Sequence, residues 1–308
     1  MEDKKKKKLK SKIKRNVVGW LIMLPTLILF TFFVWYPLVK NIIISFFDTY
    51  DMNNFVFLQN YQDVFKDDYF ISAFVNTFKY ILWSIIIGFF IPMIVGLFLS
   101  EIIHFKGFFR VAIYIPCMLS GIAVVFLFQN IYGDEAYSIL NVIRSLFGME
   151  RMDFRSNADI VIPLIVVAMT WKGFGGTSLI YMSNFQDIDT NLYEASRIDG
   201  ASPMQRFFKI TLPLMKPTIL TLLILQIISV FQVFYEPMII AGQTATSAMS
   251  LMQLSYYYFT KMEDTKSAAT SVILALIIII ITIIYFTIVN KLNNSKEKSK
   301  WNIKIKKP

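Results

Sequence analysis

The chain has 308 residues, of which 56% are hydrophobic and 16% aromatic, and its mean hydropathy is +0.54. This composition excludes an ordinary soluble domain and predicts a polytopic membrane protein. The net charge of +10 lies at the chain ends, because residues 1–16 and 291–308 together carry sixteen Lys/Arg and three acids. Basic tails of this kind are typical of contact with anionic lipid headgroups. We therefore expect membrane lipid as their partner and no nucleic acid.

Six apolar segments in chain order predict six transmembrane helices and an all-α membrane protein. Each reaches about the 20 residues that a helix needs to cross the hydrocarbon core. The segments are residues 17–39, 80–100, 111–133, 160–186, 217–235 and 267–290. We expect one six-helix membrane domain over 17–290 between the basic tails 1–16 and 291–308, with the third helix kinked by Pro116.

The distribution of basic residues predicts the orientation. An even number of helices places both termini on one side of the membrane. The tails and the loops at 100–110 and 187–216 carry twenty-two Lys/Arg, whereas 40–70, 134–159 and 236–266 carry seven. The positive-inside bias then predicts cytoplasmic termini in a cell membrane. The first apolar run has 23 residues without a small-x-small cleavage site, so we expect it to stay in the mature chain.

Residues that carry chemistry are sparse. The single cysteine, Cys117, permits no internal disulfide and no cysteine-based metal site. The single histidine and the lack of a carboxylate cluster argue against a membrane enzyme. The sequence has no GxxxxGK[ST] phosphate loop, so we expect no directly bound cofactor and no ATPase site of its own. Any ATP-driven process in which this chain takes part would need a partner to bind the ATP.

Two features outside the regular spans stand out. In the 134–159 loop, the sequence SILNVIRSLFG predicts a short amphipathic helix that lies on the outer face of the membrane. In the fourth apolar segment, Lys172 lies near the bilayer centre, where an ionisable side chain suggests a function. It precedes Gly173, Phe174, Gly175 and Gly176, whose glycines permit close backbone approach.

The polar stretch Asn191–Pro213 separates the fourth and fifth apolar segments and predicts two short helices. Asn191 is the expected N-cap of the first helix, with Glu194 completing a capping box, and Gly200 ends it in the left-handed conformation. Ser202 caps the second helix, which begins with Pro203. We expect that helix to end before Leu212, Pro213 and Pro217, where the chain turns back into the membrane. The spacing alone leaves two equal alternatives for this stretch. It is either a binding element for a soluble protein or an amphipathic connector that rests on lipid.

This stretch resembles the EAA motif of permease subunits of binding-protein-dependent ABC importers, with EAxxxDGA followed by IxLP. The matching positions are Glu194, Ala195, Asp199, Gly200, Ala201, Ile210, Leu212 and Pro213, with Ser196 where alanine is commoner. The resemblance continues through LPTLILFTFFVWYP, FLQNYQDVF, GFFRVAIYIP and WKGFG into the sugar-importer branch of this family, of the kind represented by the maltose and glycerol-phosphate permeases. Where that branch usually has GGP after the fifth helix, this chain has IIAGQTATSA.

The resemblance implies an ABC type I importer permease architecture in which the 187–216 loop docks on a cytoplasmic ATPase. It implies a second homologous permease, an ATPase dimer that binds ATP-Mg, and an extracytoplasmic solute-binding protein that delivers a sugar. A non-sugar solute such as glycerol phosphate is the alternative. A secondary carrier is less favoured, because it would show inverted repeats and intramembrane acids.

Proteins bind sugars through hydrogen-bonding groups and aromatic faces. We therefore select candidates for the substrate path by their side-chain chemistry and their expected depth in the membrane. Trp171 and Lys172 in the fourth span and Gln226 in the fifth are expected near mid-membrane. The remaining candidates are expected nearer the outer mouth and are Gln232, Tyr235 and Glu236.

Overall fold

The computed structural model describes residues 2–102 and 104–305, and the side chains of residues 16–102 and 104–291. The regular elements of the described chain are helices, and one isolated β-bridge joins Phe47 and Phe55. The basic tails predicted at 1–16 and 291–308 fall almost wholly outside the residues whose side chains are described.

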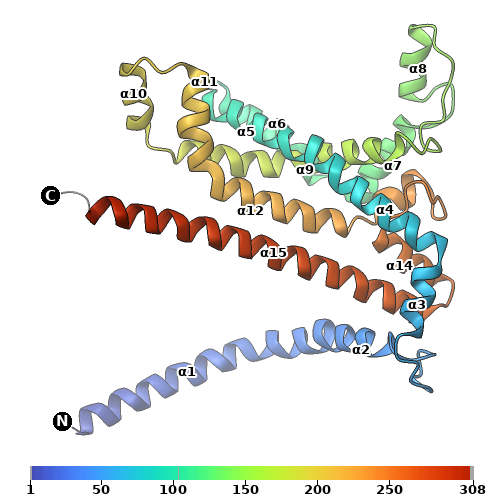
Figure 1. The fold of residues 1–308 in the computed structure, drawn as a ribbon, viewed down its shortest axis with the longest axis horizontal. Helices are drawn as coiled ribbons and strands as arrows, with labels where there is room; N and C mark the ends of the chain where they lie inside the picture. The colour runs from blue at the N-terminus through green and yellow to red at the C-terminus, as the bar shows by residue number, and fades with distance from the viewer. Residues whose placement is uncertain (1, 103, 306–308) are drawn as a thin grey trace.

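The helices alternate long spans with short connecting pieces (Figure 1). Within residues 2–102 and 104–305, three π-helices, η1 to η3, interrupt the α-helical runs. The elements are α1 (Glu2–Phe30), η1 (Thr31–Trp35), α2 (Tyr36–Ile44), α3 (Gln59–Lys66), α4 (Asp68–Trp83), η2 (Ser84–Phe89), α5 (Phe90–Glu101), α6 (Lys106–Met118), α7 (Gly121–Ile131), α8 (Ile139–Leu146), α9 (Val161–Gln186), α10 (Thr190–Ile198), α11 (Pro203–Arg206), η3 (Phe207–Thr211), α12 (Leu212–Phe231), α13 (Tyr235–Ile240), α14 (Leu251–Thr260) and α15 (Asp264–Ile305).

Five helical segments of the described chain are long and apolar enough to cross a membrane, and a bent pair makes a sixth candidate span. The five are Asn16–Ile44, Asp68–Glu101, Val161–Gln186, Pro203–Phe231 and Asp264–Lys291. The sixth joins α6 to α7 across a bend of 90°. Each of the six apolar segments of the sequence therefore corresponds to one span or, for the third segment, to this bent pair.

The bend in the third span lies beyond the residue expected to cause it. Pro116 is buried inside α6, whereas the helix breaks at Leu119 and Ser120, both of which have extended backbone angles. The Leu119 amide hydrogen-bonds the Pro116 carbonyl at 3.2 Å, which closes α6 with a tight final turn. The chain can then redirect because Gly121 begins a new helix after the break.

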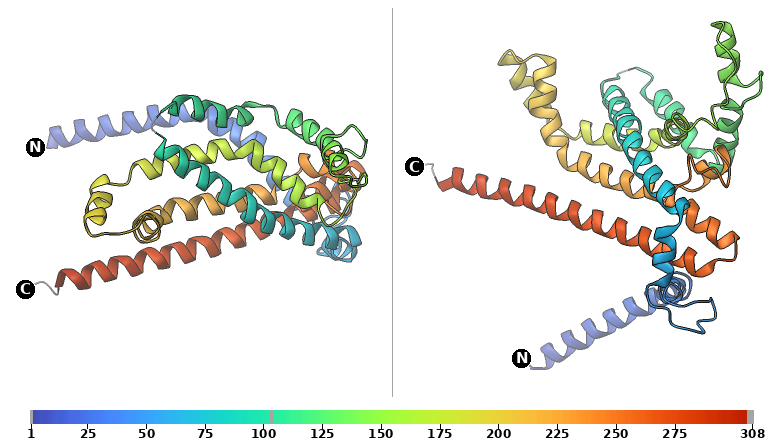
Figure 2. Two further views of the ribbon diagram at one scale, coloured as in Figure 1. Left: turned by 90° about the horizontal axis from the view of Figure 1, so that it is seen from above. Right: turned by 45° about the vertical axis from the view of Figure 1, so that its right-hand side comes forward.

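Helix α9 is the centre of the fold. It packs against α5 and α6 most extensively, and also against α4, α7, α12 and α13. This contact explains why its apolar residues surround the whole helix instead of forming one stripe. Figures 1 and 2 show α9, α12 and the continuous span of α4, η2 and α5 running between the end that carries α10 and α11 and the end that carries α14. Buried Ile162, Ile165 and Val166 belong to the largest core cluster.

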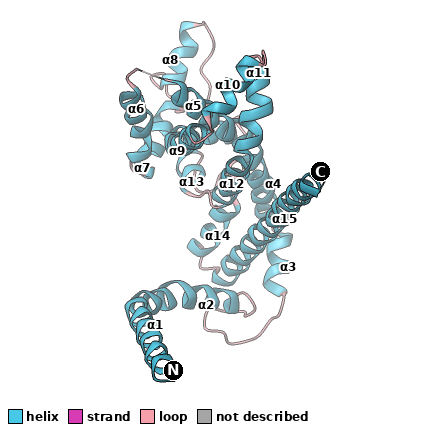
Figure 3. Ribbon diagram, turned by 90° about the vertical axis from the view of Figure 1, so that its left-hand side faces the viewer, coloured by secondary structure: helices cyan, strands magenta, loops and turns pink. Residues whose placement is uncertain are grey.

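The first span packs differently from the others. None of the 18-residue apolar window of Asn16–Ile44 is buried, and Trp20, Phe32 and Phe33 are among its most exposed side chains. Figure 3 shows α1 standing apart from the bundle around α9. This helix therefore presents apolar surface on all sides, available to lipid or to another protein.

Candidate functional site

The loop between α9 and α12, residues 187–216, projects from one end of the bundle (Figure 1). Its first helix, α10 (Thr190–Ile198), begins two residues earlier than predicted. Asp189 is the N-cap, and its carboxylate accepts a hydrogen bond from the Asn191 amide at 3.0 Å. The prediction of Asn191 as the cap with Glu194 as its reciprocal partner is wrong, because Asp189 supplies the acceptor first. Glu194 is thereby left free of a capping role and is exposed.

The turn between α10 and α11 matches its prediction. Gly200 has φ +75°, and the Ala201 amide bonds the Ser196 carbonyl at 2.9 Å. Ser202 caps α11 in a capping box with Gln205, and Pro203 occupies the first turn. Both helix ends at this turn are therefore fixed by specific hydrogen bonds, which makes the turn a defined corner.

The second helix of the loop does not end before Leu212. It continues from Pro203 through η3 into α12 and reaches Phe231 without a break, so the predicted turn at Leu212, Pro213 and Pro217 is wrong. The π-helix η3 ends two residues before Pro213. Widening the helix there relieves the clash between a proline ring and the carbonyl one turn earlier. The loop is thus rigidly continuous with the fifth apolar span.

The outer surface of this loop carries both the motif residues and exposed apolar side chains. Glu194, Ala195, Asp199, Gly200 and Pro213 are exposed, while Ser196, Ala201, Ile210 and Leu212 are half-buried. Ile198 is 87% exposed and Met204 is 66% exposed. Apolar side chains so exposed beside charged ones are typical of a protein contact surface, so this end of the molecule is suited to bind a partner.

A cavity of about 630 Å³ lies between this loop and the ends of α5 and α9. Glu101, Glu194, Arg197 and Arg206 line it together with Tyr193. The Arg206 Nε is buried without a hydrogen-bond partner in the described part of the chain. The sequence analysis did not single out Tyr193 or Arg206, since only the fold brings α10, α11 and α5 around one space.

Helix α9 contacts the bent span through its glycine-rich stretch, as the small residues predicted. A Cβ added at Gly175 would lie 2.1 Å from the Ile113 carbonyl oxygen, so α6 and α9 touch backbone to backbone there. The Gly176 amide donates to the Cys117 sulfur at 3.3 Å. The Lys172 ammonium lies beside Gly121, 3.0 Å from where a Cβ would stand, at the start of α7. This places Lys172 at the break of the third span.

A second cavity, of about 340 Å³, lies halfway along the spans between η2, α9 and α12. The side-chain amide of Gln226 borders it and donates to the Ser84 carbonyl at 2.7 Å. The polar or small residues that line it, other than Gln226, are Ser84, Gly88, Thr170, Gly173, Thr177 and Ser229. Of these, the sequence pointed only to Gly173, since a single hydroxyl or glycine in an apolar run gives no signal before the helices are packed.

The six predicted path residues do not gather in one place. Of these, only Gln226 lines the second cavity. Trp171 packs edge-on against Phe128, with ring centroids 5.6 Å apart. Lys172 lies at the break of the third span, beside Gly121. The other three lie at the end of α12 or just past it, with Gln232 and Tyr235 exposed and Glu236 half-buried.

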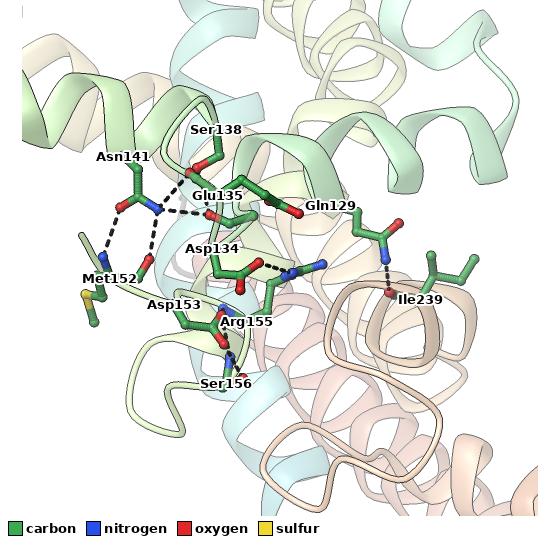
Figure 4. A network of polar contacts seen from close by, with 11 residues as sticks. Gln129, Asp134, Glu135, Ser138, Asn141, Met152, Asp153, Arg155, Ser156 and Ile239 are labelled. Carbon is green, nitrogen blue, oxygen red and sulfur yellow. Dashed lines mark hydrogen bonds and ion pairs between the residues drawn. The ribbon is translucent and has the colours of Figure 1, made fainter.

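The 134–159 segment forms a compact unit at the end of the bundle opposite α10 (Figures 1 and 4). Its predicted helix is present as α8, with Ile139, Ile143, Leu146 and Phe147 exposed. Buried Asn141 donates to the carbonyls of Gly133 and Met152 at 3.1 and 3.0 Å and accepts from the Met152 amide at 3.0 Å.

An ion pair completes this unit, since Arg155 contacts Asp134 at 2.7 Å. Burial alone would raise the pKa of Asp153, but hydrogen bonds from Ser156 and Arg155 hold it below its usual value. The segment is therefore structured by its own polar contacts, and it leaves the apolar face of α8 open.

Comparison with known proteins supplies the context for this geometry. Residues 84–297 match the family model described as binding-protein-dependent transport system inner membrane component. The arabinooligosaccharides transport system permease protein AraP of Bacillus subtilis strain 168 is 29% identical over 246 residues, 79% of this chain and 78% of that protein. The lactose transport system permease protein LacF of Rhizobium radiobacter is 28% identical over 81% of this chain and 85% of its own length.

A solved structure shares the fold. A chain of a bacterial ABC transporter involved in the import of the acidic polysaccharide alginate superposes with a TM-score of 0.82 at 23% identity. The match covers 92% of this chain and 99% of that one. The six apolar segments, the bent third span and the projecting 187–216 loop thus belong to the architecture of an ABC importer permease, a multi-pass membrane protein.

Proposed function

This chain belongs to the family of binding-protein-dependent transport system inner membrane components, and we propose that it conducts a sugar across the membrane as one permease subunit of an ABC importer. The observation that carries the proposal is the 187–216 loop. Its motif residues Glu194, Ala195, Asp199 and Gly200 are exposed at a turn whose two flanking helix ends are fixed by hydrogen bonds, and its second helix continues without interruption into a membrane span. A soluble partner that displaces such a loop would also move the membrane span that is continuous with it.

The soluble partner we propose is a dimeric ATPase that binds ATP-Mg on the cytoplasmic side, with both termini of this chain on that side. The basic residues of the tails and of the 187–216 loop support this orientation. Exposed Glu194 and Asp199 with the apolar Ile198 and Met204 supply both charged and apolar contacts for docking. In this scheme the chain itself carries out no hydrolysis.

The transported class we propose is a mono- or oligosaccharide. AraP and LacF are named for arabinooligosaccharides and lactose, and the mid-membrane cavity has hydroxyl and amide groups among apolar walls. Such a mixture suits transient binding of sugar hydroxyls. We assign Gln226 to the path, with Trp171 and Lys172 on the neighbouring stretch of α9 and Gln232, Tyr235 and Glu236 toward the outer end.

A second permease would complete the pathway. The exposed α1 and the break of the third span beside Lys172 leave apolar and polar surface that one chain does not cover. We propose that a homologous subunit, giving a heterodimer, covers this surface, and that a solute-binding protein delivers the sugar at the end carrying α8. ATP binding would then favour the outward-open state by several kcal/mol through the docked loop.

The test is reconstitution. The chain is co-expressed with its partner permease, ATPase and binding protein, and sugar uptake into proteoliposomes is measured with and without ATP. We expect uptake only with ATP and loaded binding protein. A chain with Glu194→Ala and Gly200→Val should lose ATPase during detergent copurification. Uptake that continues without the ATPase, or unchanged ATPase association in that variant, would contradict the proposal.

To identify the sugar, the binding protein is screened against a sugar panel by thermal shift. A single stabilising ligand that also enters the proteoliposomes would identify the substrate. A binding protein stabilised only by non-sugar solutes, such as glycerol phosphate, would overturn the assignment to sugars and leave the ABC permease role intact.

A further inference from the structure

One hydrogen bond crosses the 187–216 loop from its first helix to its second. The Tyr193 hydroxyl of α10 lies 2.7 Å from the Thr211 hydroxyl, the last residue of η3. Thr211 is only 4% exposed, and Tyr193 is half-buried. The bond is thus shielded from water, which makes it harder for solvent to replace either partner.

This contact is isolated within the loop. Among the described residues, it is the single side-chain hydrogen bond between α10 and the helix that runs from Pro203 to Phe231. Tyr193 and Thr211 both line the 630 Å³ cavity beneath the loop. Because a cavity lies where side chains would otherwise pack against α10, the Tyr193–Thr211 hydrogen bond is the contact that fixes the distance between α10 and the second helix.

The position of Thr211 depends on η3. A π-helix adds one residue to a helical run, and one residue turns the following side chains by about 100°. The π-helix Phe207–Thr211 therefore sets the register in which Thr211 faces α10.

A second bond ties the same two legs of the loop nearer the membrane. The Thr218 hydroxyl of α12 donates to the Asn184 side-chain oxygen of α9 at 2.7 Å. The Asn184 amide in turn donates to the Ile180 carbonyl at 2.9 Å, which orients it. Two cross-links thus join the first leg, α9 and α10, to the second, η3 and α12.

We propose that Tyr193 and Thr211 are positioning residues that brace α10 against the fifth span, so that a displacement of the docked loop moves α12 and does not collapse α10 into the cavity. The inference rests on the proposed function, since it concerns how the loop transmits force from the ATPase. It assigns this role to two residues outside the EAA motif positions. Asn184 and Thr218 complete the brace at the membrane end.

The test uses the complete transporter in proteoliposomes and compares ATP hydrolysed per sugar imported. Tyr193→Phe removes one hydroxyl, and Thr211→Val removes the other with nearly unchanged volume. A net hydrogen bond of ordinary strength corresponds to a change of about threefold to tenfold in an equilibrium. We expect each variant to raise the ATP consumed per sugar by about that factor, with unchanged ATPase copurification. The double variant should do no worse than either single one, because both remove the same bond.

Two further variants serve as controls. Thr211→Ser keeps the hydroxyl and should restore most of the coupling. Thr221→Val removes a hydroxyl that bonds only the Pro217 carbonyl of its own helix, and it should behave as the unmodified chain. Amide hydrogen exchange provides a readout that does not depend on transport, and α10 amides should exchange faster in Tyr193→Phe and Thr211→Val but not in Thr221→Val.

The outcomes separate the two proposals. If the unmodified transporter imports sugar with ATP but Tyr193→Phe and Thr211→Val keep both normal coupling and normal α10 exchange, the brace is wrong and the permease role stands. If the unmodified assembly shows no ATP-dependent import, the proposed function fails, while faster α10 exchange in the variants would still establish the brace as a structural contact.

Discussion

The side-chain amide of Gln226 in α12 donates a hydrogen bond to the main-chain carbonyl of Ser84, the first residue of η2, at 2.7 Å. Gly88 makes room for this amide, since a Cβ there would lie 2.6 Å from the Gln226 Nε2. The contact joins the second and fifth spans beside the mid-membrane cavity. A sugar that enters this cavity would therefore meet a glutamine already oriented by the protein.

Gln226→Leu should destabilise the chain by about 1–2 kcal/mol, because the substitution removes an interhelical hydrogen bond inside the membrane. Thermal unfolding of the purified chain in detergent measures this. Gln232→Leu is the matched control, since the Gln232 amide is exposed and bonds only the Ile228 carbonyl of its own helix. Equal melting temperatures for the two variants would show that the Ser84 contact contributes nothing to stability.

Gly175→Ala should be among the most disruptive single substitutions. Its new methyl group would lie 2.1 Å from the backbone oxygen of Ile113, and backbone cannot rotate away as a side chain can. Separating α6 from α9 should cost about 1–3 kcal/mol. Gly173→Ala, two residues earlier in the same helix, meets nothing within 4 Å and should be tolerated.

Monodisperse yield and melting temperature in detergent distinguish these two glycine variants. A stable, well-expressed Gly175→Ala chain would mean that α6 and α9 do not touch as described. If Gly173→Ala lost stability and Gly175→Ala did not, the open space beside Gly173 and the close contact at Gly175 would both be contradicted.

Gly200→Ala should weaken the loop through backbone strain and not through crowding. The residue has φ +75°, and no atom lies within 4 Å of an added Cβ. Holding a non-glycine residue in this region costs roughly 1–2 kcal/mol. Binding of the isolated ATPase to the detergent-solubilised permeases should fall by about fivefold to thirtyfold if that strain reshapes the corner.

Gly200→Asn should lose less affinity, because asparagine tolerates the left-handed region better than alanine. Gly107→Ala, at another open position, should bind the ATPase normally. If the Gly200→Asn chain bound the ATPase more weakly than the Gly200→Ala chain, backbone strain would be excluded as the cause.

Asn141→Ala should loosen the 134–159 segment without affecting the spans. The buried Asn141 side chain bonds both the carbonyl and the amide of Met152, so its removal leaves these two groups without that partner at a cost of about 1–3 kcal/mol. Limited proteolysis of the purified chain should cut this segment faster. Ser145→Ala, whose hydroxyl bonds only the nearby Val142 carbonyl, should be cut at the original rate.

Several features were predictable because they depend on local rules. The apolar runs match the spans, and Gly200 and Ser202 match the ends of α10 and α11, because a left-handed glycine and a capping serine act on their immediate neighbours. Asn191 was assigned as a cap in error, because Asp189 competes for the same role two residues earlier. Pro213 and Pro217 suggested a break, but the π-helix η3 just before Pro213 accommodates that proline, and the helix continues through both prolines.

By itself the sequence determined that the chain lies in a membrane, how many apolar segments it has and where the 187–216 loop lies. Hydrophobicity, charge and motif spacing are properties of short stretches and can be read without the fold. Only the tertiary structure decided that Gln226 meets Ser84, that Lys172 lies at the break beside Gly121, and that Tyr193 pairs with Thr211. These pairs are separated by between 18 and 142 residues along the chain. Their partners are chosen by how α9 packs among its neighbours, and no local pattern encodes which face of one helix meets which face of another.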